Sequence, residues 1–462
     1  MKKKKSTLGF EKNDQIELEI TGMTAEGNGV GRYREVAIFV PNAAIGDRLR
    51  IRVVKTAKTY AFGKIEEILH PSADRIPVDC PQFSQCGGCV FRHIQYEAEL
   101  RIKEQRVRDA ISRIGGIEGL TIHPILGAPQ VDHYRNKAQF PIGRARDGGL
   151  LLGFYAHHSH RIVACDTCAL QPAVFDQAVQ VFRQWEQEYP QEVYDESTGK
   201  GRLRHFYLRY AQATGEMMVC VVVNGNGLVG EDRLVQLLRE QVPEVKSVVI
   251  NSNREKTNVI LGKKCRTVWG ADTITDILCG VRFRISPLSF YQVNREQAER
   301  LYQLAGKYAD LKGQETLLDL YCGTGTIGLS MACQAKKLVG VEVVPQAIED
   351  AKQNALENQI QNAEFFCGDA AQAAKMLFQR GECPDVVVVD PPRKGCDAEL
   401  IQTIQRMTPE RVVYISCDPA TLARDLKIFS QSGYQPMELT PVDMFPRTHH
   451  IECAVLLKKK DQ

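Results

Sequence analysis

A cysteine in the segment RVVYISCDPATLARDL lies where a thiol can react. Cys417 ends a run of β-branched and aromatic residues, and Pro419 prevents the strand from continuing. The residues that follow have helical character, so we expect the thiol to lie near a helix N-terminus, which lowers a thiol pKa below its reference of about 8.5. Most free cysteines are small core residues, but the end of a strand favours a reactive role for this one.

Three glycines follow an expected strand in the pattern G-x-G-x-x-G and lead into a helix: Gly323, Gly325 and Gly328. Glu342 ends the next expected strand, where a carboxylate can accept hydrogen bonds from a ribose. Dinucleotide dehydrogenases and S-adenosylmethionine methyltransferases both use this motif. Asp390, in the sequence DPPR at the end of a later strand, favours the methyltransferase, because an acidic residue before two prolines resembles the strand-four motif of nucleic-acid base methyltransferases.

A thiolate beside a methyl donor can activate uracil for methylation. Such activation is needed because C5 of uracil is a poor nucleophile. Addition of the thiolate at C6 makes C5 nucleophilic toward a sulfonium methyl group, and a base then removes the C5 proton as the thiolate leaves. Glu452, 35 residues after Cys417, is the candidate base, and His450 is the alternative. A metal site made of His449, His450, Glu452 and Cys453 is less favoured, because no second cluster has zinc-finger spacing.

The elements that position these residues follow from the hydrophobic pattern. From residue 286 strands alternate with helices, and runs such as VVVV belong in a sheet buried on both faces. The expected fold class is therefore α/β, with a doubly wound, Rossmann-like domain over 286–462. Residues 1–70 are expected to form a small β-barrel of short strands and glycine turns, similar to an oligonucleotide-binding fold. Residues 71–285 are expected to form a central α+β domain that binds RNA.

A helix is predicted over 96–114, and we expect it to pack on the catalytic domain. Gly115-Gly116 is a typical C-cap. The expected apolar face consists of Leu100, Val107, Ile111 and Ile114. The expected i,i+4 ion pairs are Glu97–Arg101, Glu99–Lys103 and Glu104–Arg108.

Several basic segments indicate nucleic acid. Arg48, Arg50 and Arg52 alternate and so share one strand face. The segments YRNKAQFPIG and GRLRHFYLRY place cations among aromatic residues, as in proteins that stack RNA bases and pair with phosphates. The alternative for all three segments is a solvated strand face with extended arginines.

The bulk composition is that of an ordinary globular protein of more than one domain. Hydrophobic residues make up 44% and charged residues 25% of 462, and the net charge is only +3. The start MKKKKSTLGF lacks the apolar stretch of a secretory signal, and the absence of a run of about 18 apolar residues predicts no membrane helix. Fifteen cysteines without such a signal indicate a reducing cytoplasm.

Taken together, the motifs resemble those of the RNA 5-methyluridine methyltransferases. The match is to the branch that has a TRAM domain and an iron–sulfur cluster and modifies 23S ribosomal RNA. It covers nearly the whole chain through YRNK, FYQVN, DLYCGTGTIGL, DPPRKG, SCDPATLARDL and HHIECAVLL. The resemblance implies Cys417 as nucleophile, Glu452 as base and Phe290 as a residue that stacks on nucleic acid. The S-adenosylmethionine-binding residues it implies are Gln292, Tyr321, Glu342, Asp369 and Asp390.

Cysteines near the central domain suggest a metal site. Cys86 and Cys89 with Cys165 and Cys168 would make a zinc site on spacing alone, but this leaves Cys80 without a role. A [4Fe–4S] cluster uses Cys80, Cys86, Cys89 and one more. The family resemblance selects Cys168 as the fourth ligand.

The resemblance also implies the partners. We expect a monomeric cytoplasmic enzyme that acts on RNA, most directly 23S ribosomal RNA, without DNA or membrane partners. The target uridine must leave its stack to reach a thiol at a sheet edge. Two alternatives remain at this point: the same chemistry on tRNA, or a non-catalytic RNA-binding ribosome assembly factor.

Overall fold

The computed structural model describes residues 9–460, so the basic start of the chain lies outside the described residues. Contacts divide the chain into two compact units. Unit 1 comprises Met1–Arg106 and Phe445–His450, and unit 2 comprises Val107–Met444 and Ile451–Gln462. None of the helices within 9–460 is long and apolar enough to cross a membrane.

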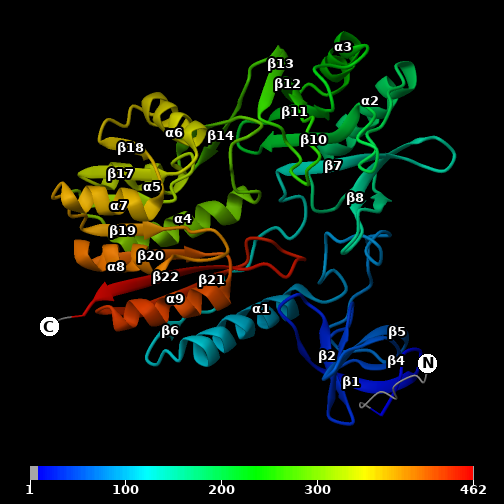
Figure 1. The fold of residues 1–462 in the computed structure, drawn as a ribbon, viewed down its shortest axis with the longest axis horizontal. Coiled ribbons are helices and arrows are strands. Elements are labelled where there is room, and N and C mark those ends of the chain that lie inside the picture. Colours follow the sequence, from blue (N-terminus) through cyan, green and yellow to red (C-terminus); the bar gives the residue numbers. More distant parts are fainter. Residues whose placement is uncertain (1–8, 461–462) are drawn as a thin grey trace. The chain divides into compact units, whose positions relative to one another are not determined.

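Five strands of unit 1 form a closed barrel in the order β1-β2-β3-β5-β4 (Figure 1). Alternate side chains of β1, among them Ile16, Leu18 and Ile20, are buried inside it. The strands are β1 (Gln15–Met23), β2 (Gly29–Tyr33), β3 (Val36–Val40), β4 (Arg48–Thr56) and β5 (Tyr60–His70). The N-terminal barrel expected from the sequence is therefore present.

Arg48, Arg50 and Arg52 share one face of β4, as their spacing predicts. They form ion pairs with acidic side chains of the two neighbouring strands. The partners are Glu17 on β1 and Glu66 and Glu67 on β5. Three carboxylates thus balance the three guanidinium groups, and this row attracts phosphate less than arginines alone would.

Helix α1 (Tyr96–Ala110) continues as one π-helical turn, Ile111–Gly115, and ends at Gly116 with φ +59°. Val107 and Ile111 are buried as predicted, but Ile114 is 47% exposed, so its assignment to the apolar face was wrong. The π turn inserts an extra residue and so rotates the following side chains relative to a regular helix.

The polar residues of α1 also differ from the helix-only expectation. Glu99 and Lys103 form the predicted ion pair with their N and O atoms 2.7 Å apart, but both side chains are buried. Arg101 pairs with Asp74 outside the helix instead of with Glu97. The three predicted pairs have the same i,i+4 spacing, so the spacing does not reveal that the Glu99–Lys103 pair is buried.

The central part of unit 2 is a seven-stranded sheet in the order β13-β12-β11-β10-β7-β8-β9. Helices α2 and α3 share an apolar core with one face of it, where the rings of Phe182 and Phe206 stack with their centroids 4.3 Å apart. The elements are β7 (Lys137–Arg144), β8 (Leu150–Tyr155), β9 (Ile162–Ala164), α2 (Ala173–Glu188), β10 (Leu203–Ala211), β11 (Glu216–Val223), α3 (Glu231–Gln241), β12 (Val245–Ser252) and β13 (Lys264–Gly270). A hairpin of β14 (Ile274–Leu278) and β15 (Val281–Ile285) follows.

The C-terminal part of unit 2 contains an eight-stranded sheet in the order β18-β17-β16-β19-β20-β22-β21-β6 (Figure 1). The strands are β6 (Thr121–Ile122), β16 (Thr316–Leu320), β17 (Lys337–Glu342), β18 (Ala363–Cys367), β19 (Val386–Val389), β20 (Arg411–Ser416), β21 (Tyr434–Val442) and β22 (Glu452–Lys459). Strands β16 to β20 are parallel, and β22 is antiparallel to β20 and β21. This is the expected doubly wound α/β sheet with an antiparallel edge.

Helices cover this sheet, which explains its unbroken valine runs. The helices are α4 (Arg295–Ala309), α5 (Thr326–Met331), α6 (Pro345–Glu357), α7 (Ala370–Gln379), α8 (Ala398–Met407) and α9 (Pro419–Gln431). Residues of α7, α8 and α9 form one core with Val387 and Val389. On the other side Gly328 of α5 lies against Leu338. All four residues of β19 are fully buried, as expected for a strand between two helical layers.

Candidate active site

The predicted residues meet at the carboxyl-terminal edge of the parallel strands. Tyr321 follows β16, Glu342 ends β17, Asp390 follows β19 and Cys417 follows β20. Ligands of open α/β sheets bind at this edge. Tyr321 has φ +67°, an uncommon conformation for a residue with a side chain that is often found at functional sites.

Strand pairing brings the end of β20, next to Cys417, beside the start of β22 at Glu452. Strands β20 and β22 are antiparallel, and Ser416 pairs with Cys453. Cys417 directly follows the last paired residue of β20, and Glu452 directly precedes Cys453 in β22. The two side chains interact, because the charge of Glu452 raises the pKa of the Cys417 thiol. Two residues 35 apart in the sequence are thereby brought together.

The thiol of Cys417 has its pKa raised to about 11, so the prediction of a lowered pKa was wrong for the ligand-free protein. Burial is the main cause, followed by the negative charges of Glu452 and Asp390, while Arg393 acts in the opposite direction. Helix α9 does begin beside the thiol. Its N-cap, Asp418, accepts the amide hydrogens of Ala420 and Thr421, however, and a capping carboxylate offsets the positive helix end.

The two carboxyl groups whose charges raise the thiol pKa also have raised pKa values themselves. Burial, and next the charge of Asp390, raise the pKa of Glu452 well above its usual range. Burial raises the pKa of Asp390 to about 7. The positive charge of Arg393 lowers the pKa of Glu452, as it does that of Cys417. This edge therefore holds three acidic groups whose pKa values are raised, and an added positive charge would lower all three pKa values.

The glycine loop has the backbone that a bound nucleoside requires. Gly323 and Gly325 have φ +56° and +82°, and a side chain at Gly323 would point into open space. The Gly323 amide donates to a carboxylate oxygen of Glu342 at 3.2 Å. A Cβ at Gly328 would lie 2.8 Å from both Asp319 Oδ2 and Leu338, so this third glycine permits close helix–strand packing. The residues present thus fit the nucleoside part of S-adenosylmethionine.

The FYQVN segment, Phe290–Asn294, is held by Asn136, the residue that directly precedes β7. The side-chain amide of Asn136 donates to the Gln292 carbonyl at 2.9 Å, and the Asn136 backbone amide donates to the Val293 carbonyl at 2.8 Å. The side chain of Gln292 is buried, whereas Phe290 is 65% exposed. An exposed aromatic ring on a fixed segment is suited to stacking on an RNA base.

Asp369 has a local explanation in the structure. It is the N-cap of α7, and its side chain accepts hydrogen bonds from the amides of Ala371 and Gln372. The residue follows β18 and is exposed. Its predicted place beside the adenine of S-adenosylmethionine stays a prediction.

Sequence reasoning missed Asp425 of α9, which holds the DPPRKG segment in place. Its buried carboxylate accepts hydrogen bonds from the Tyr414 hydroxyl at 2.7 Å and the Cys396 amide at 2.8 Å. The neighbouring Arg424 donates to the Lys394 carbonyl at 2.7 Å. A buried acid within the conspicuous motif SCDPATLARDL was the available signal.

The predicted metal ligands lie in two segments. Cys80, Cys86 and Cys89 are half-buried in a turn-rich part of unit 1, and Cys168 is half-buried in unit 2. The Cys165 thiol donates to the Thr167 carbonyl at 3.0 Å. Over residues 9–460, no group of three or more His, Cys, Asp or Glu side chains is arranged to hold a metal ion. No step of the chemistry is therefore derived through a cluster, and the iron–sulfur ligands remain predictions.

His449 and His450, the residues of the alternative base and metal interpretations, belong to unit 1. Their ring centroids are 4.1 Å apart, and the His450 amide donates to the Thr448 hydroxyl at 3.2 Å. They are part of the loop between β21 and β22. Within 9–460 these two histidines belong to no group of three or more side chains arranged to hold a metal ion.

The sheet, the glycine turn and the acidic strand ends define an S-adenosylmethionine-dependent methyltransferase. The family model tRNA (Uracil-5-)-methyltransferase matches residues 95–460, and the TRAM domain model matches residues 10–65. The chain belongs to this methyltransferase family. Its reaction is the S-adenosylmethionine-dependent methylation of uridine C5 in RNA, and the TRAM and methyltransferase regions bind the RNA.

Individual relatives agree with this assignment over the full length. The chain is 45% identical to an uncharacterized RNA methyltransferase of Halalkalibacterium halodurans, covering 99% of this chain and 100% of that one. It is 43% identical to one of Bacillus cereus over 99% of both. The crystal structure of Pyrococcus abyssi tRNA (uracil-54, C5)-methyltransferase with S-adenosyl-L-homocysteine is similar, with a TM-score of 0.77 and 28% identity, covering 96% of this chain and 99% of that one.

Proposed function

We propose that Cys417 is the nucleophile and Glu452 the base of this uridine C5 methylation. The observation that supports the proposal is the pairing of the end of β20 with the start of β22, together with the effect of the Glu452 charge on the Cys417 thiol. A nucleophile and a base on opposite strands can act on C6 and C5 of one pyrimidine ring. Asp390, at the end of the next strand, adds a polar group for the uracil edge.

The chemistry follows from the charges of this edge. Cys417 loses its proton to solvent, and its sulfur then bonds to C6, which makes C5 nucleophilic. S-adenosylmethionine, when bound, supplies the methyl group on a positively charged sulfur, and a positive charge lowers the pKa of neighbouring acids. C5 forms a bond to this methyl group as the bond between the methyl group and the donor sulfur breaks. Glu452, which ionises while the positively charged donor is bound, then takes the C5 proton. The C5–C6 double bond re-forms as the C6–sulfur bond breaks, and Cys417 leaves as the thiolate.

Two substitutions test these roles. Cys417→Ala should abolish methyl transfer, and Glu452→Gln should transfer the methyl group but accumulate a covalent protein–RNA adduct on a denaturing gel. Cys333→Ala, at an exposed cysteine outside the site, is the matched control and should behave as wild type. Turnover by Cys417→Ala would refute the nucleophile, and normal release by Glu452→Gln would refute the base.

We propose that Gln292, Tyr321, Glu342, Asp369 and Asp390 bind S-adenosylmethionine. The position of Glu342, which accepts the Gly323 amide, supports a contact with the ribose. Calorimetry with S-adenosyl-L-homocysteine should show affinity reduced on the order of tenfold for Glu342→Gln, the size of one good hydrogen bond to a charged group. Asp369→Asn keeps an N-cap, so a loss of affinity there would reflect ligand contact, and unchanged affinity would remove Asp369 from the site.

We propose 23S ribosomal RNA as the substrate and a monomer acting in the cytoplasm, without DNA or membranes. This choice rests on the family motifs. The similarity to the Pyrococcus abyssi enzyme, whose substrate is tRNA uracil-54, favours tRNA as the second candidate. Mass spectrometry of 5-methyluridine in both RNAs from a deletion strain distinguishes them, because only the true substrate loses the modification. Unchanged ribosomal RNA would refute our first choice.

We propose that Cys80, Cys86, Cys89 and Cys168 hold a [4Fe–4S] cluster. The family motifs support Cys168 as the fourth ligand. Protein purified without oxygen should absorb near 400 nm and contain about four irons per chain. Cys168→Ala should lose this absorption and Cys165→Ala should retain it. A colourless protein that contains zinc would refute the cluster.

A further inference from the structure

The connection between β21 and β22 determines where Glu452 lies. Val442, the last residue of β21, pairs with Glu452, the first residue of β22. The nine residues 443–451 therefore connect two paired positions on neighbouring strands. The last loop residue directly precedes Glu452. A change in the path of this loop therefore acts first on that carboxyl group.

The first residues of the loop are held within unit 2 through their carbonyl groups. The side chain of Gln297 donates to the Asp443 carbonyl at 2.9 Å, and that of Asn294 donates to the Met444 carbonyl at 3.1 Å. Both donors belong to the start of α4, which begins after its N-cap Asn294. This end of the loop is therefore fixed by residues of the catalytic unit itself.

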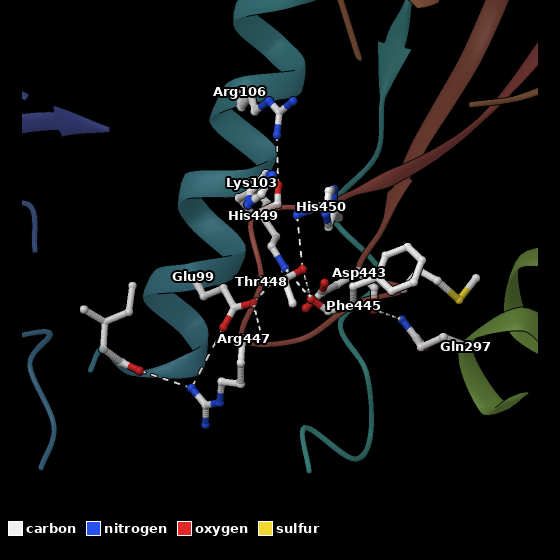
Figure 2. Close-up of polar contacts among 12 residues, drawn as sticks. Glu99, Lys103, Arg106, Gln297, Asp443, Phe445, Arg447, Thr448, His449 and His450 are labelled. Atoms are coloured by element: carbon white, nitrogen blue, oxygen red, sulfur yellow. Dashed lines mark hydrogen bonds and ion pairs between the residues drawn. The ribbon is translucent and has the colours of Figure 1, made fainter. Parts of the chain in front are cut away.

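The middle of the loop is held by polar residues of α1, all within unit 1 (Figure 2). Glu99, Lys103 and Arg106 are spaced by four and three residues, so they lie on one helix face. Each bonds to the main chain of the loop. The contacts are Lys103 Nζ to the Phe445 carbonyl at 3.2 Å, the Arg447 amide to Glu99 Oε1 at 2.8 Å, and the Arg106 guanidinium to the His449 carbonyl at 2.8 Å.

Hydrogen bonds hold both the main chain and the side chain of Arg447. Its carbonyl accepts the amide hydrogens of Val90 and Phe91 at 2.7 and 3.1 Å, and its guanidinium donates to the Ile94 carbonyl at 3.2 Å. Its φ is +67°, which is strained for a residue with a side chain. Such strain persists only where the surroundings over-determine the conformation. The loop is thus forced into one path by its partners.

The loop also closes on itself next to its end. The Thr448 hydroxyl donates to the Phe445 carbonyl at 2.8 Å and accepts the His450 amide at 3.2 Å. Only Ile451, which is buried, separates this turn from Glu452. The fixed turn and the paired strand leave the carboxyl-bearing residue little freedom at its N-terminal side.

We propose that Glu99, Lys103 and Arg106 are positioning residues for Glu452, acting through the main chain of Phe445–His450. The inference rests on the proposed role of Glu452 as the base. Methyl transfer needs Cys417 and the methyl donor, whereas removal of the C5 proton and release of Cys417 need the carboxylate in place. Loosening the loop should therefore slow adduct release and leave methyl transfer nearly unchanged. A misplacement of about 1 Å can cost a reaction step on the order of 100-fold.

The main test compares two arginines of the same helix. Arg106→Met removes the bond to the His449 carbonyl, and Arg101→Met, whose side chain pairs with Asp74 instead, is the matched control. Each variant is mixed once with labelled S-adenosylmethionine and the unmodified RNA that wild type methylates, 23S ribosomal RNA or tRNA. Methyl incorporation and the covalent adduct are followed over time. We expect the adduct to persist on the order of tenfold longer in Arg106→Met and as in wild type in Arg101→Met.

A second variant avoids the buried Glu99–Lys103 pair, whose disruption can unfold a protein. Thr448→Val removes both hydroxyl contacts of the loop turn and should also prolong the adduct. Normal adduct release in Arg106→Met and Thr448→Val would overturn the inference, and so would an equal loss of methyl transfer and release. Glu452→Gln separates the two proposals. If it traps the adduct and the loop variants do not, only the positioning inference fails; if it releases the adduct normally, the base assignment fails as well.

Discussion

The outer face of the barrel and the edge of the catalytic sheet use charge in opposite ways. On β4 each arginine faces a glutamate of a neighbouring strand, and these side chains are at least partly exposed. At the sheet edge Asp390 and Glu452 lie near the Cys417 thiol, with Arg393 as the positive group acting on Glu452 and Cys417. The first arrangement is neutralised, and the second holds an excess of acidic groups.

The two regions differ in how strongly their charges interact, because one is exposed to water and the other is buried. Exposed pairs lie in water, where their attraction is weak and side-chain ordering offsets much of it. Buried acids near one another keep their protons instead, which raises the pKa of each group. Such an edge is prepared for a positively charged ligand, because a single added charge favours ionisation of all of them. The predictions below test this contrast, beginning with the largest expected effect.

Asp319→Asn should remove a strong pH dependence of stability. Asp319 is fully buried in β16, and burial raises its pKa from 3.8 to about 8 in the folded protein. Its stabilising contribution is therefore complete below pH 4 and is lost as the pH rises toward 8. Asp319 alone should lower the free energy of unfolding by up to about 1.4 kcal/mol per pH unit, so the fall with pH should be less steep by that amount in the variant. Urea unfolding of the ligand-free protein from pH 5 to 8 measures both slopes.

The control for that experiment is Asp310→Asn. Asp310 is exposed, and its hydrogen bond to Lys312 lowers its pKa. This variant should keep the wild-type slope over the same pH range. Parallel curves for wild type and Asp319→Asn would contradict the prediction.

Arg393→Met should make Cys417 less acidic. Removing the positive charge destabilises the thiolate, so the thiol pKa should rise by about one unit and the thiolate fraction at pH 8 should fall about tenfold. The alkylation rate of Cys417 by iodoacetamide against pH, read from the peptide by mass spectrometry, measures this. Lys394→Met, at the neighbouring exposed position, should alkylate as wild type does, and faster alkylation of Arg393→Met would refute the effect.

Asp390→Asn should shift the same thiol in the other direction. The negative charge of Asp390 raises the pKa of Cys417 and of Glu452, so its removal should lower both. We expect alkylation of Cys417 at pH 8 to become several-fold faster. The measurement is made without RNA or methyl donor, so a role of Asp390 in binding does not affect it. A slower or unchanged rate would show that burial alone determines the thiol pKa.

Arg50→Ala should have the smallest effect. Arg50 pairs with Glu17 and Glu67 on an exposed face, and such pairs contribute little to stability. We expect the melting temperature to change by no more than about 1 °C. A large decrease in differential scanning calorimetry would show that the barrel face is a cooperative network and would remove the contrast between the two regions.

Local patterns were enough to predict the catalytic sheet. KLVGVE coincides with β17, and RVVYISC gives β20 with Cys417 just after its end. The ends of such strands carry the chemistry, so the thiol and the acidic residues could be named in advance. The predicted domain limits at 70 and 285 remain predictions.

What the sequence did not reveal depends on the partners brought by folding. The thiol pKa was predicted in the wrong direction because Asp418 caps α9 and the charge of Glu452 acts on the thiol, and neither follows from the helix start alone. The π turn that exposes Ile114 has no sequence signature that we recognised. The burial of Glu99 and Lys103 was also missed, since their spacing is that of an ordinary surface pair.

The loop held by α1 has a consequence for how the protein is made. Arg447 and its partner Glu99 are 348 positions apart, and the chain emerges from the ribosome with its N-terminus first. The N-terminal unit therefore stays incomplete until Phe445–His450 have been synthesised. A truncated chain cannot supply Phe445–His450, so maturation of this unit and delivery of Glu452 to the sheet become one late event in translation.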